Sequence, residues 1–153
     1  MSGLASIAID DGGLPPPEEA IAREREVAVR DLIEDAAFAL PEGRLGGPYD
    51  LRLGLRDGRL AFEIAAAGAP AAEFHLALGP FRQVVKDYAQ ICAALEEAQR
   101  AMPSRAEAID MARRGIHDEG ARVLIERLEG KAELDLPTAR RLFTLICVLH
   151  PGG

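Results

Sequence analysis

The stretch LFTLICVL, residues 142–149, decides the fold of this 153-residue chain. Only Thr144 in it is polar, and threonine still carries a methyl group. A helix that is apolar on every side cannot lie on a protein surface, because one of its faces would meet water. It is also shorter than the ~20 apolar residues that a membrane-spanning helix needs. We expect a buried central helix with a sheet on one side and helices on the other. The alternative is a helix that only a partner subunit covers completely.

The overall composition describes one ordinary globular domain over residues 1–153. Hydrophobic residues make up 48% of the chain and charged residues 28%, which is typical of a folded protein of this length. The net charge of −7 opposes nucleic-acid binding, which depends on cations placed at phosphates. Five phenylalanines, two tyrosines and no tryptophan also supply few surfaces for base stacking. We therefore expect an acidic protein that binds no nucleic acid.

The cysteines and the N-terminus indicate a cytoplasmic location. Cys92 and Cys147 fall within apolar helical patterns and have no CxxC spacing, as is usual for thiols in a reducing compartment. The opening residues, MSGLASIAIDDGG, lack the basic region of a signal peptide. No run of residues is long and apolar enough to cross a membrane, so we expect no membrane association.

A β-hairpin can be predicted down to its register. Asp57-Gly58 is a strong two-residue turn signal, because both positions of such a turn adopt positive φ. Closing the chain there pairs Arg56 with Arg59, Leu55 with Leu60, Leu53 with Phe62, and Leu51 with Ile64. All the large apolar side chains then share one face, and a slip of one residue would turn them outward. The same register places Arg52 opposite Glu63, where we expect a cross-strand ion pair.

The other elements follow from periodicity and from turn residues. We expect strands over residues 4–10 and 73–78, helices over 18–39 and 79–100, and an alanine-rich loop over 65–72. Ser104 and Glu107 indicate a capping box, followed by two helices, 104–118 and 120–129, or one bent helix. A short edge strand over 131–135 and a last helix capped by Asp135 complete the chain. The predicted fold class is α+β: an antiparallel sheet, made of a hairpin-based meander and the N-terminal strand, covered on one face by helices.

The richest group of polar residues lies in and directly after the helix predicted over 104–118. It comprises Asp110, Arg113, Arg114, His117, Asp118 and Glu119. One interpretation is a ladder of ion pairs on a solvated helix, where each pair contributes only tenths of a kcal/mol. The other is an anion site formed by Arg113, Arg114 and His117, with Lys86 as a further contributor. Because Arg113 and Arg114 diverge by about 100° on an ideal helix, that site requires a bend or a close approach at Gly115.

Metal and cysteine chemistry are poorly supported. His117, Asp118 and Glu119 are consecutive and would point in different directions from a helix, so we predict no metal site and no cofactor. Cys147 precedes His150 by three residues but lies in the apolar helix, where burial quiets a thiol. There is no GxxxxGK[ST], no GxSxG and no GxGxxG after a strand. No catalytic residue is assigned, and enzymatic activity is not predicted.

Four segments carry a resemblance to a known family: PFRQVVKDY, EAIDMARRGIHDEG, RLEGK and TARRLFTLICVLH. With these segments the chain resembles a small alphaproteobacterial family of uncharacterised proteins of the UPF type. The resemblance covers nearly the whole chain and is most specific from Gly79 onward. It implies a bacterial cytoplasmic protein without an assigned activity, and it transfers no functional residue.

Two functions are consistent with these observations. The first is a non-enzymatic interaction or regulatory module that forms a homodimer or binds a protein partner, because apolar helix surface is abundant and catalytic motifs are absent. The second is a binding protein or enzyme for a small phosphorylated or carboxylated metabolite, with Lys86, Arg113, Arg114 and His117 at its site.

Overall fold

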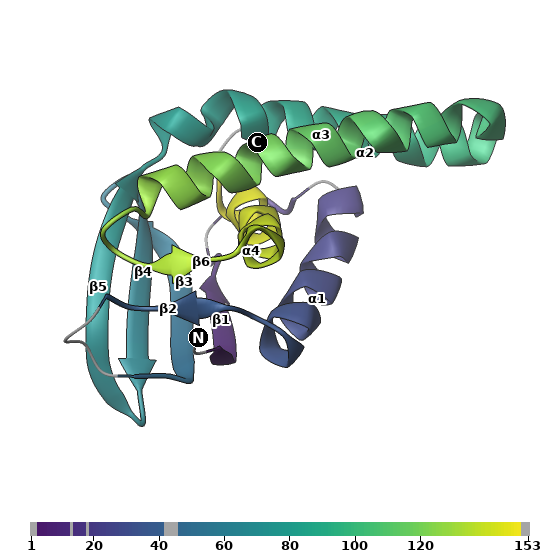
Figure 1. Cartoon of the computed structure of the whole chain (residues 1–153). Helices are drawn as coiled ribbons and strands as arrows, with labels where there is room; N and C mark the ends of the chain where they lie inside the picture. Colours follow the sequence, from purple (N-terminus) through teal and green to yellow (C-terminus); the bar gives the residue numbers. More distant parts are fainter. Residues whose placement is uncertain (1–2, 13, 18, 42–45, 151–153) are drawn as a thin grey trace.

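The computed structural model describes residues 3–12, 14–17, 19–41 and 46–150 (Figure 1). Its α+β class confirms the prediction. The elements, in chain order, are β1 (Leu4–Asp10), α1 (Glu19–Glu34), β2 (Phe38–Ala39), β3 (Tyr49–Arg56), β4 (Arg59–Ala66), β5 (Ala69–Ala77), the 3₁₀ turn η1 (Gly79–Phe81), α2 (Arg82–Ala101), α3 (Pro103–Arg127), β6 (Glu133–Leu134) and α4 (Leu136–Leu149). Among them is no helix of the length and hydropathy that crossing a membrane requires.

The main sheet has the strand order β1-β3-β4-β5 and is mixed. Strands β3, β4 and β5 form the expected antiparallel meander, whereas β1 runs parallel to β3. The prediction of a wholly antiparallel sheet is therefore wrong at its N-terminal strand. The reason is α1, which lies between β1 and β3 in the chain and provides the long crossover that a parallel pair needs.

The β3–β4 hairpin has the predicted register at every position named above. Asp57 and Gly58 form its turn with φ values of 53° and 75°. The predicted ion pair between Arg52 and Glu63 is wrong, although the two residues stand opposite each other. Arg52 instead lies 3.5 Å from Asp10 of β1, and Glu63 lies 2.9 Å from Arg56. The parallel β1 strand supplies a carboxylate that the hairpin alone does not contain.

Two predictions of secondary structure are wrong, because strand pairing overrides the preferences of the local sequence. Residues 65–72 form a second hairpin instead of a loop, with Ala67 and Gly68 at its turn and φ values of 52° and 82°. The helix predicted to reach residue 39 ends at Glu34, because Phe38–Ala39 pairs with Glu133–Leu134 in a separate small sheet. The short strand predicted at 131–135 thus exists, but it borders β2 and not the main sheet.

Helix α3 is continuous through both of its interior glycines. The predicted capping box is wrong, since Met102 is the N-cap residue and no side chain caps the helix. At Gly120 a Cβ atom would lie 2.5 Å from the ring of Phe143, so glycine permits the close packing of α3 on α4. The predicted cap of α4 is confirmed: the Thr138 backbone N–H donates to Asp135 Oδ1 at 3.0 Å.

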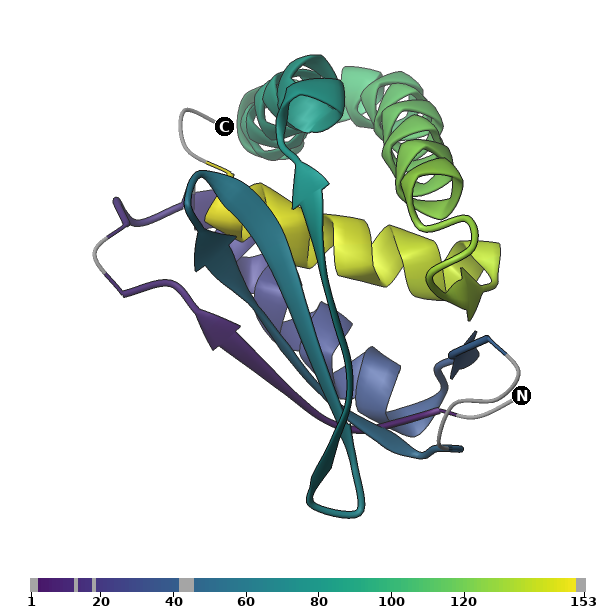
Figure 2. The ribbon, with the colours of Figure 1, turned by 90° about the vertical axis from the view of Figure 1, so that its left-hand side faces the viewer.

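Helix α4 is the centre of the molecule, as predicted. All of residues 142–149 are buried, and α4 lies between the sheet and the paired helices α2 and α3 (Figure 2). Leu145 and Val148 are buried within a single chain, so the helix does not need a partner subunit to cover it. The chain's own elements therefore cover the apolar helix, while the far ends of α2 and α3 project beyond the body (Figure 1).

Candidate functional site

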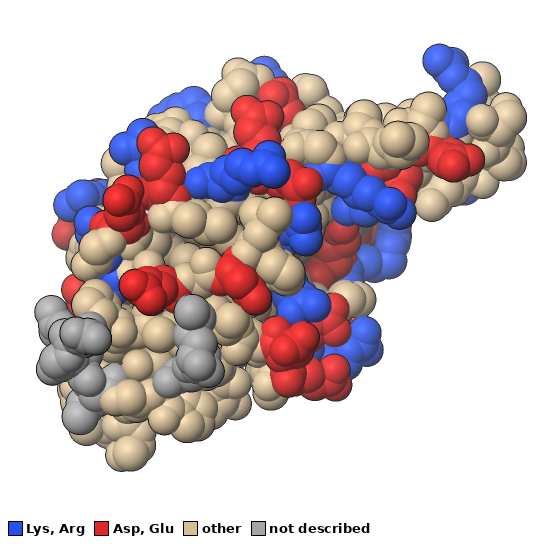
Figure 3. Space-filling view, viewed as in Figure 1, with Lys and Arg blue, Asp and Glu red and all other residues tan. Residues whose placement is uncertain are grey.

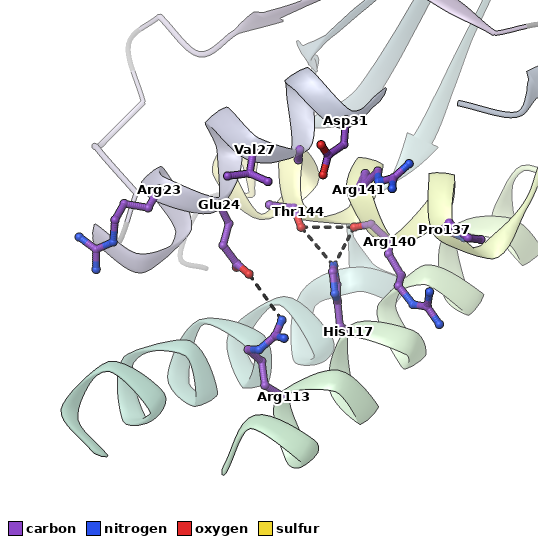
Figure 4. A pocket seen from close by; sticks show the side chains of 11 residues that line it. Arg23, Glu24, Val27, Asp31, Arg113, His117, Pro137, Arg140, Arg141 and Thr144 are labelled. Atoms are coloured by element: carbon purple, nitrogen blue, oxygen red, sulfur yellow. Dashed lines mark hydrogen bonds and ion pairs between the residues drawn. The ribbon is translucent and has the colours of Figure 1, made fainter. Parts of the chain in front are cut away.

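A cleft of about 520 Å³ opens between α1, α3 and α4 (Figure 4). It is lined by Arg23, Glu24, Val27, Ala28, Asp31, Arg113, His117, Pro137, Arg140, Arg141 and Thr144. Basic and acidic side chains alternate over this part of the surface instead of forming a patch of one sign (Figure 3). The charges that could bind a ligand are therefore those that have no partner within the protein.

Two of the four predicted site residues line this cleft. Arg113 and His117 face it from α3, four residues apart and so on one side of the helix. Arg114 points away, with 71% of its side chain exposed and Asp110 as its partner at 3.0 Å. Lys86 is exposed on α2 and does not line the cleft. No bend at Gly115 brings the two arginines together, because α3 is one helix and a Cβ at Gly115 would meet no described atom within 4 Å.

At one end of the cleft, which we call the inner end, a cluster of polar and charged side chains surrounds Glu24. The Tyr88 hydroxyl lies 2.9 and 2.8 Å from the two carboxylate oxygens of Glu24. Arg113 Nη1 is 3.5 Å from Glu24 Oε1, and Arg113 Nε donates to Asp110 Oδ1 at 2.9 Å. Only 19% of the Arg113 side chain is exposed. This cluster, which we call the Glu24 tie (Glu24, Tyr88, Asp110 and Arg113), joins α1 to α2 and α3.

The tie also fixes the protonation of its neighbours. Burial, reinforced by the charge of Glu24, raises the pKa of Tyr88, so its hydroxyl remains a donor. Burial, again together with Glu24, raises the pKa of Cys92 to about 12, and the thiol stays protonated and unreactive. The hydrogen bond from Arg113 lowers the pKa of Asp110, whose carboxylate stays ionised. Neither the Tyr88 hydroxyl nor the Cys92 thiol is therefore activated as a nucleophile near neutral pH.

His117 occupies the middle of the cleft in its neutral form. Its ring stacks on Tyr88 with the ring centroids 4.8 Å apart, and burial lowers its pKa. Nε2 lies 2.8 Å from the Arg140 carbonyl oxygen, which is an acceptor, so Nε2 carries the proton and donates it there. Within the described chain Nδ1 has no hydrogen-bond partner. It is therefore an acceptor without a partner on a residue that lines the cleft.

The opposite end, which we call the outer end, holds two charged side chains with a weak ion pair or with no ion pair. Arg141 Nη1 donates to the backbone oxygen of Asp35 at 2.9 Å, and no carboxylate of the described residues lies within 4.0 Å of its guanidinium. Asp31 has one ionic contact, to Arg30 Nε at 4.0 Å. By contrast, Arg140 is hydrogen-bonded to Asp118, and Arg23 is paired with Glu19 and Glu96. We call Asp31 and Arg141 the outer pair.

Several of these residues escaped prediction from the sequence. Glu24 lies among Arg25, Glu26 and Arg30, which by themselves indicate a solvated helix face, and its contact with Tyr88 spans 64 positions. Arg140 and Arg141 could have been found from the sequence. Two arginines that directly precede the apolar run 142–149 must lie where the buried helix reaches the surface. In the described ranges, no three His, Cys, Asp or Glu side chains are grouped so that they could hold a metal ion.

The fold and the cleft define a small α+β protein with a partly charged cleft between three helices. The model of UPF0262, described as an uncharacterised protein family, matches residues 1–151, and the chain belongs to this family. The family resemblance expected from the sequence is thereby confirmed, and the family has no assigned activity.

Relatives of similar length come from alphaproteobacteria. A UPF0262 protein of Roseobacter denitrificans is 60% identical over 159 residues, and the alignment covers 100% of both chains. One from Dinoroseobacter shibae is also 60% identical over 159 residues with 100% of both chains covered. A third, from Paracoccus denitrificans, is 61% identical over 156 residues, covering 97% of this chain and 96% of its own. No solved structure matches the chain.

Proposed function

We propose that this protein binds a small anionic metabolite in the cleft between α1, α3 and α4. The observation that carries the proposal is Arg141, a cation at the cleft without a carboxylate partner among the described residues. A guanidinium forks onto a carboxylate or a phosphate through two parallel hydrogen bonds, and one donor of Arg141 is already held by a backbone oxygen. That bond orients the side chain and leaves its other donors for a ligand.

The rest of the cleft supports binding more than catalysis. His117 Nδ1 offers one acceptor, and Val27, Ala28 and Pro137 offer apolar contacts. A concave site with a few placed polar groups is the usual form of a small-molecule site. The cleft residues supply no activated nucleophile, so the proposed activity is binding, and we assign no catalytic role.

The interaction module remains the second proposal, with less support than before. Its main reason was the apolar helix α4, which the chain itself covers. The large apolar side chains that are exposed in the described regions are Val27, Ile33, Met102 and Met111. Val27 belongs to the cleft, and the other three do not line it. These side chains do not define a surface for a homodimer or for another protein partner. The cytoplasmic location is likewise retained as a proposal on the buried thiols of Cys92 and Cys147.

The experiment is a thermal-shift screen of carboxylated and phosphorylated metabolites with three proteins: wild type, Arg141→Gln and Arg114→Gln. A ligand at 100 times its Kd stabilises the wild type by about 2.7 kcal/mol, which raises Tm by several degrees. Arg141→Gln should lose that shift. Arg114→Gln removes an equally charged but exposed side chain outside the cleft and should keep it. A metabolite that shifts all three proteins equally would bind elsewhere and would contradict the proposal.

A further inference from the structure

The charged side chains of the cleft fall into those that already have an ionic partner and those that are left for a ligand. Six charged side chains line it: Arg23, Glu24, Asp31, Arg113, Arg140 and Arg141. Glu24 and Arg113 lie within ion-pair distance of each other. Arg23 and Arg140 are paired with carboxylates that lie outside the cleft lining. The outer pair, one acidic and one basic residue, is what remains for a ligand.

The two members of the outer pair lie on facing helices and close to each other. Arg141 of α4 donates to the backbone oxygen of Asp35, which follows the last residue of α1. Asp31 precedes Asp35 by four residues, about one helical turn or ~5.4 Å along the axis. Their charged groups nevertheless do not meet, because no carboxylate of the described chain is within 4.0 Å of Arg141. Figure 4 shows the Asp31 side chain of α1 and the Arg141 side chain of α4 at the same end of the cleft.

An anion without any positive charge would fit this arrangement poorly. It would gain the attraction of Arg141 but would also meet the carboxylate of Asp31, whose one ionic contact is Arg30 at 4.0 Å. An exposed contact of that length neutralises little charge, and 66% of the Arg30 side chain is exposed. A ligand with a carboxylate and an ammonium group would satisfy both members at once.

The wall between the charges is suited to a short carbon skeleton. Val27, Ala28 and Pro137 line the cleft beside the outer pair, and Val27 is 46% exposed. Covering a half-exposed valine removes apolar surface from water and favours binding.

We propose that the ligand is an amino acid or a similarly small zwitterion, with its carboxylate on Arg141 and its ammonium group on Asp31. This inference rests on the proposed function of the cleft and narrows its ligand to one chemical class. Among the carboxylated and phosphorylated metabolites, it predicts a preference for those that also carry an amino group.

The test uses calorimetric titration of the full chain with three pairs of compounds that differ only in an amino group. They are L-leucine and 4-methylpentanoate, L-glutamate and glutarate, and 4-aminobutyrate and butyrate. In at least one pair the amino compound should bind about fivefold to tenfold more tightly, as expected for one additional hydrogen-bonded charge contact in a partly exposed site.

Variants at Asp31 identify the source of that preference. Asp31→Asn should bring both members of the pair to similar affinity, and Asp31→Glu, which keeps the charge, should restore the difference. Glu107→Gln, at an exposed position of α3 outside the cleft lining, is the matched control and should leave the preference unchanged.

Three results would overturn the inference. Equal or tighter binding by the compounds without an amino group would exclude the zwitterion but leave anion binding in the cleft intact. Failure of all six compounds to bind would also reject it, and the screen with Arg141→Gln would then decide separately whether the cleft binds any anion. A preference that survives Asp31→Asn would place the amino group elsewhere and would equally contradict it.

Discussion

The two ends of the cleft use the same kinds of residue for different purposes. At the inner end, the Glu24 tie satisfies its charges within the protein and places Arg113 at 19% side-chain exposure. At the outer end, Asp31 and Arg141 approach each other across the same cleft without forming an ion pair. The difference shows that charge at a cleft indicates binding only after its internal partners have been subtracted. The inner end should therefore determine stability, and the outer end affinity.

The largest expected effect is on stability at the inner end. Arg113→Gln removes the cation beside Glu24 and Asp110 and leaves two carboxylates without it, so the free energy of unfolding should fall by about 2–3 kcal/mol. Urea unfolding followed by circular dichroism measures this change. The neighbouring Arg114→Gln is the control and should change stability by less than about 0.5 kcal/mol. Equal losses in both variants would remove the distinction between a tied and a solvated arginine.

Tyr88→Phe tests the same end with a smaller change. The substitution keeps the ring that stacks on His117 but removes the hydroxyl between Glu24 and Arg113. Loss of that group should cost about 1–2 kcal/mol in urea unfolding. Tyr49→Phe offers a comparison outside the cleft. An unchanged stability for Tyr88→Phe would mean that α1 is held by apolar packing alone.

The pH dependence of stability tests the residue between the two ends. Burial lowers the pKa of His117 below its ordinary 6.5, so the unfolded chain binds the proton more readily than the folded one. Stability should therefore be complete above that value and decrease as the pH falls below it, by at most about 1.4 kcal/mol per pH unit from this residue.

Replacing His117 by Gln should remove this part of the pH dependence. The loss would be seen as a flatter plot of unfolding free energy between neutral pH and the range where carboxylates titrate. A slope that persists in His117→Gln would assign the effect to another group.

The smallest effect on stability is expected at the outer end. Arg141 has one hydrogen bond, to a backbone oxygen, and no ion pair with a described carboxylate. Arg141→Gln should therefore change the unfolding free energy by less than about 0.5 kcal/mol. A loss comparable to that of Arg113→Gln would show that Arg141 anchors α4 to α1 and is not held for a ligand.

Elements governed by short-range patterns could be predicted from the sequence. The turn at Asp57-Gly58 requires positive φ at two adjacent residues, and this local condition fixed the whole β3–β4 register. The apolar run of residues 142–149 could only be buried, and it is. The alanine-rich hairpin was missed because Ala67-Gly68 is a weak turn signal and its pairing is set by β4.

Only the residues of the candidate site that lie on one helix could be predicted, because their spacing is local. Arg113 and His117 lie four residues apart on one helix, so helical spacing was sufficient to group them. Glu24, Asp31 and Arg141 come to the cleft from α1 and α4, and only tertiary packing brings them together. The same packing decides that Arg113 is tied and that Arg114, one residue later, is solvated.

The most direct test of the account is calorimetric titration of the best ligand from the thermal-shift screen into Arg141→Gln and Arg113→Gln proteins. The account predicts that Arg141→Gln weakens binding by about 1.5–3 kcal/mol, the contribution of a hydrogen bond to a charged group. Arg113→Gln, at a temperature where it remains folded, should bind within about threefold of the wild type, because its charges are satisfied internally. Unchanged binding by Arg141→Gln, or a loss confined to Arg113→Gln, would contradict the division of the cleft into a structural end and a binding end.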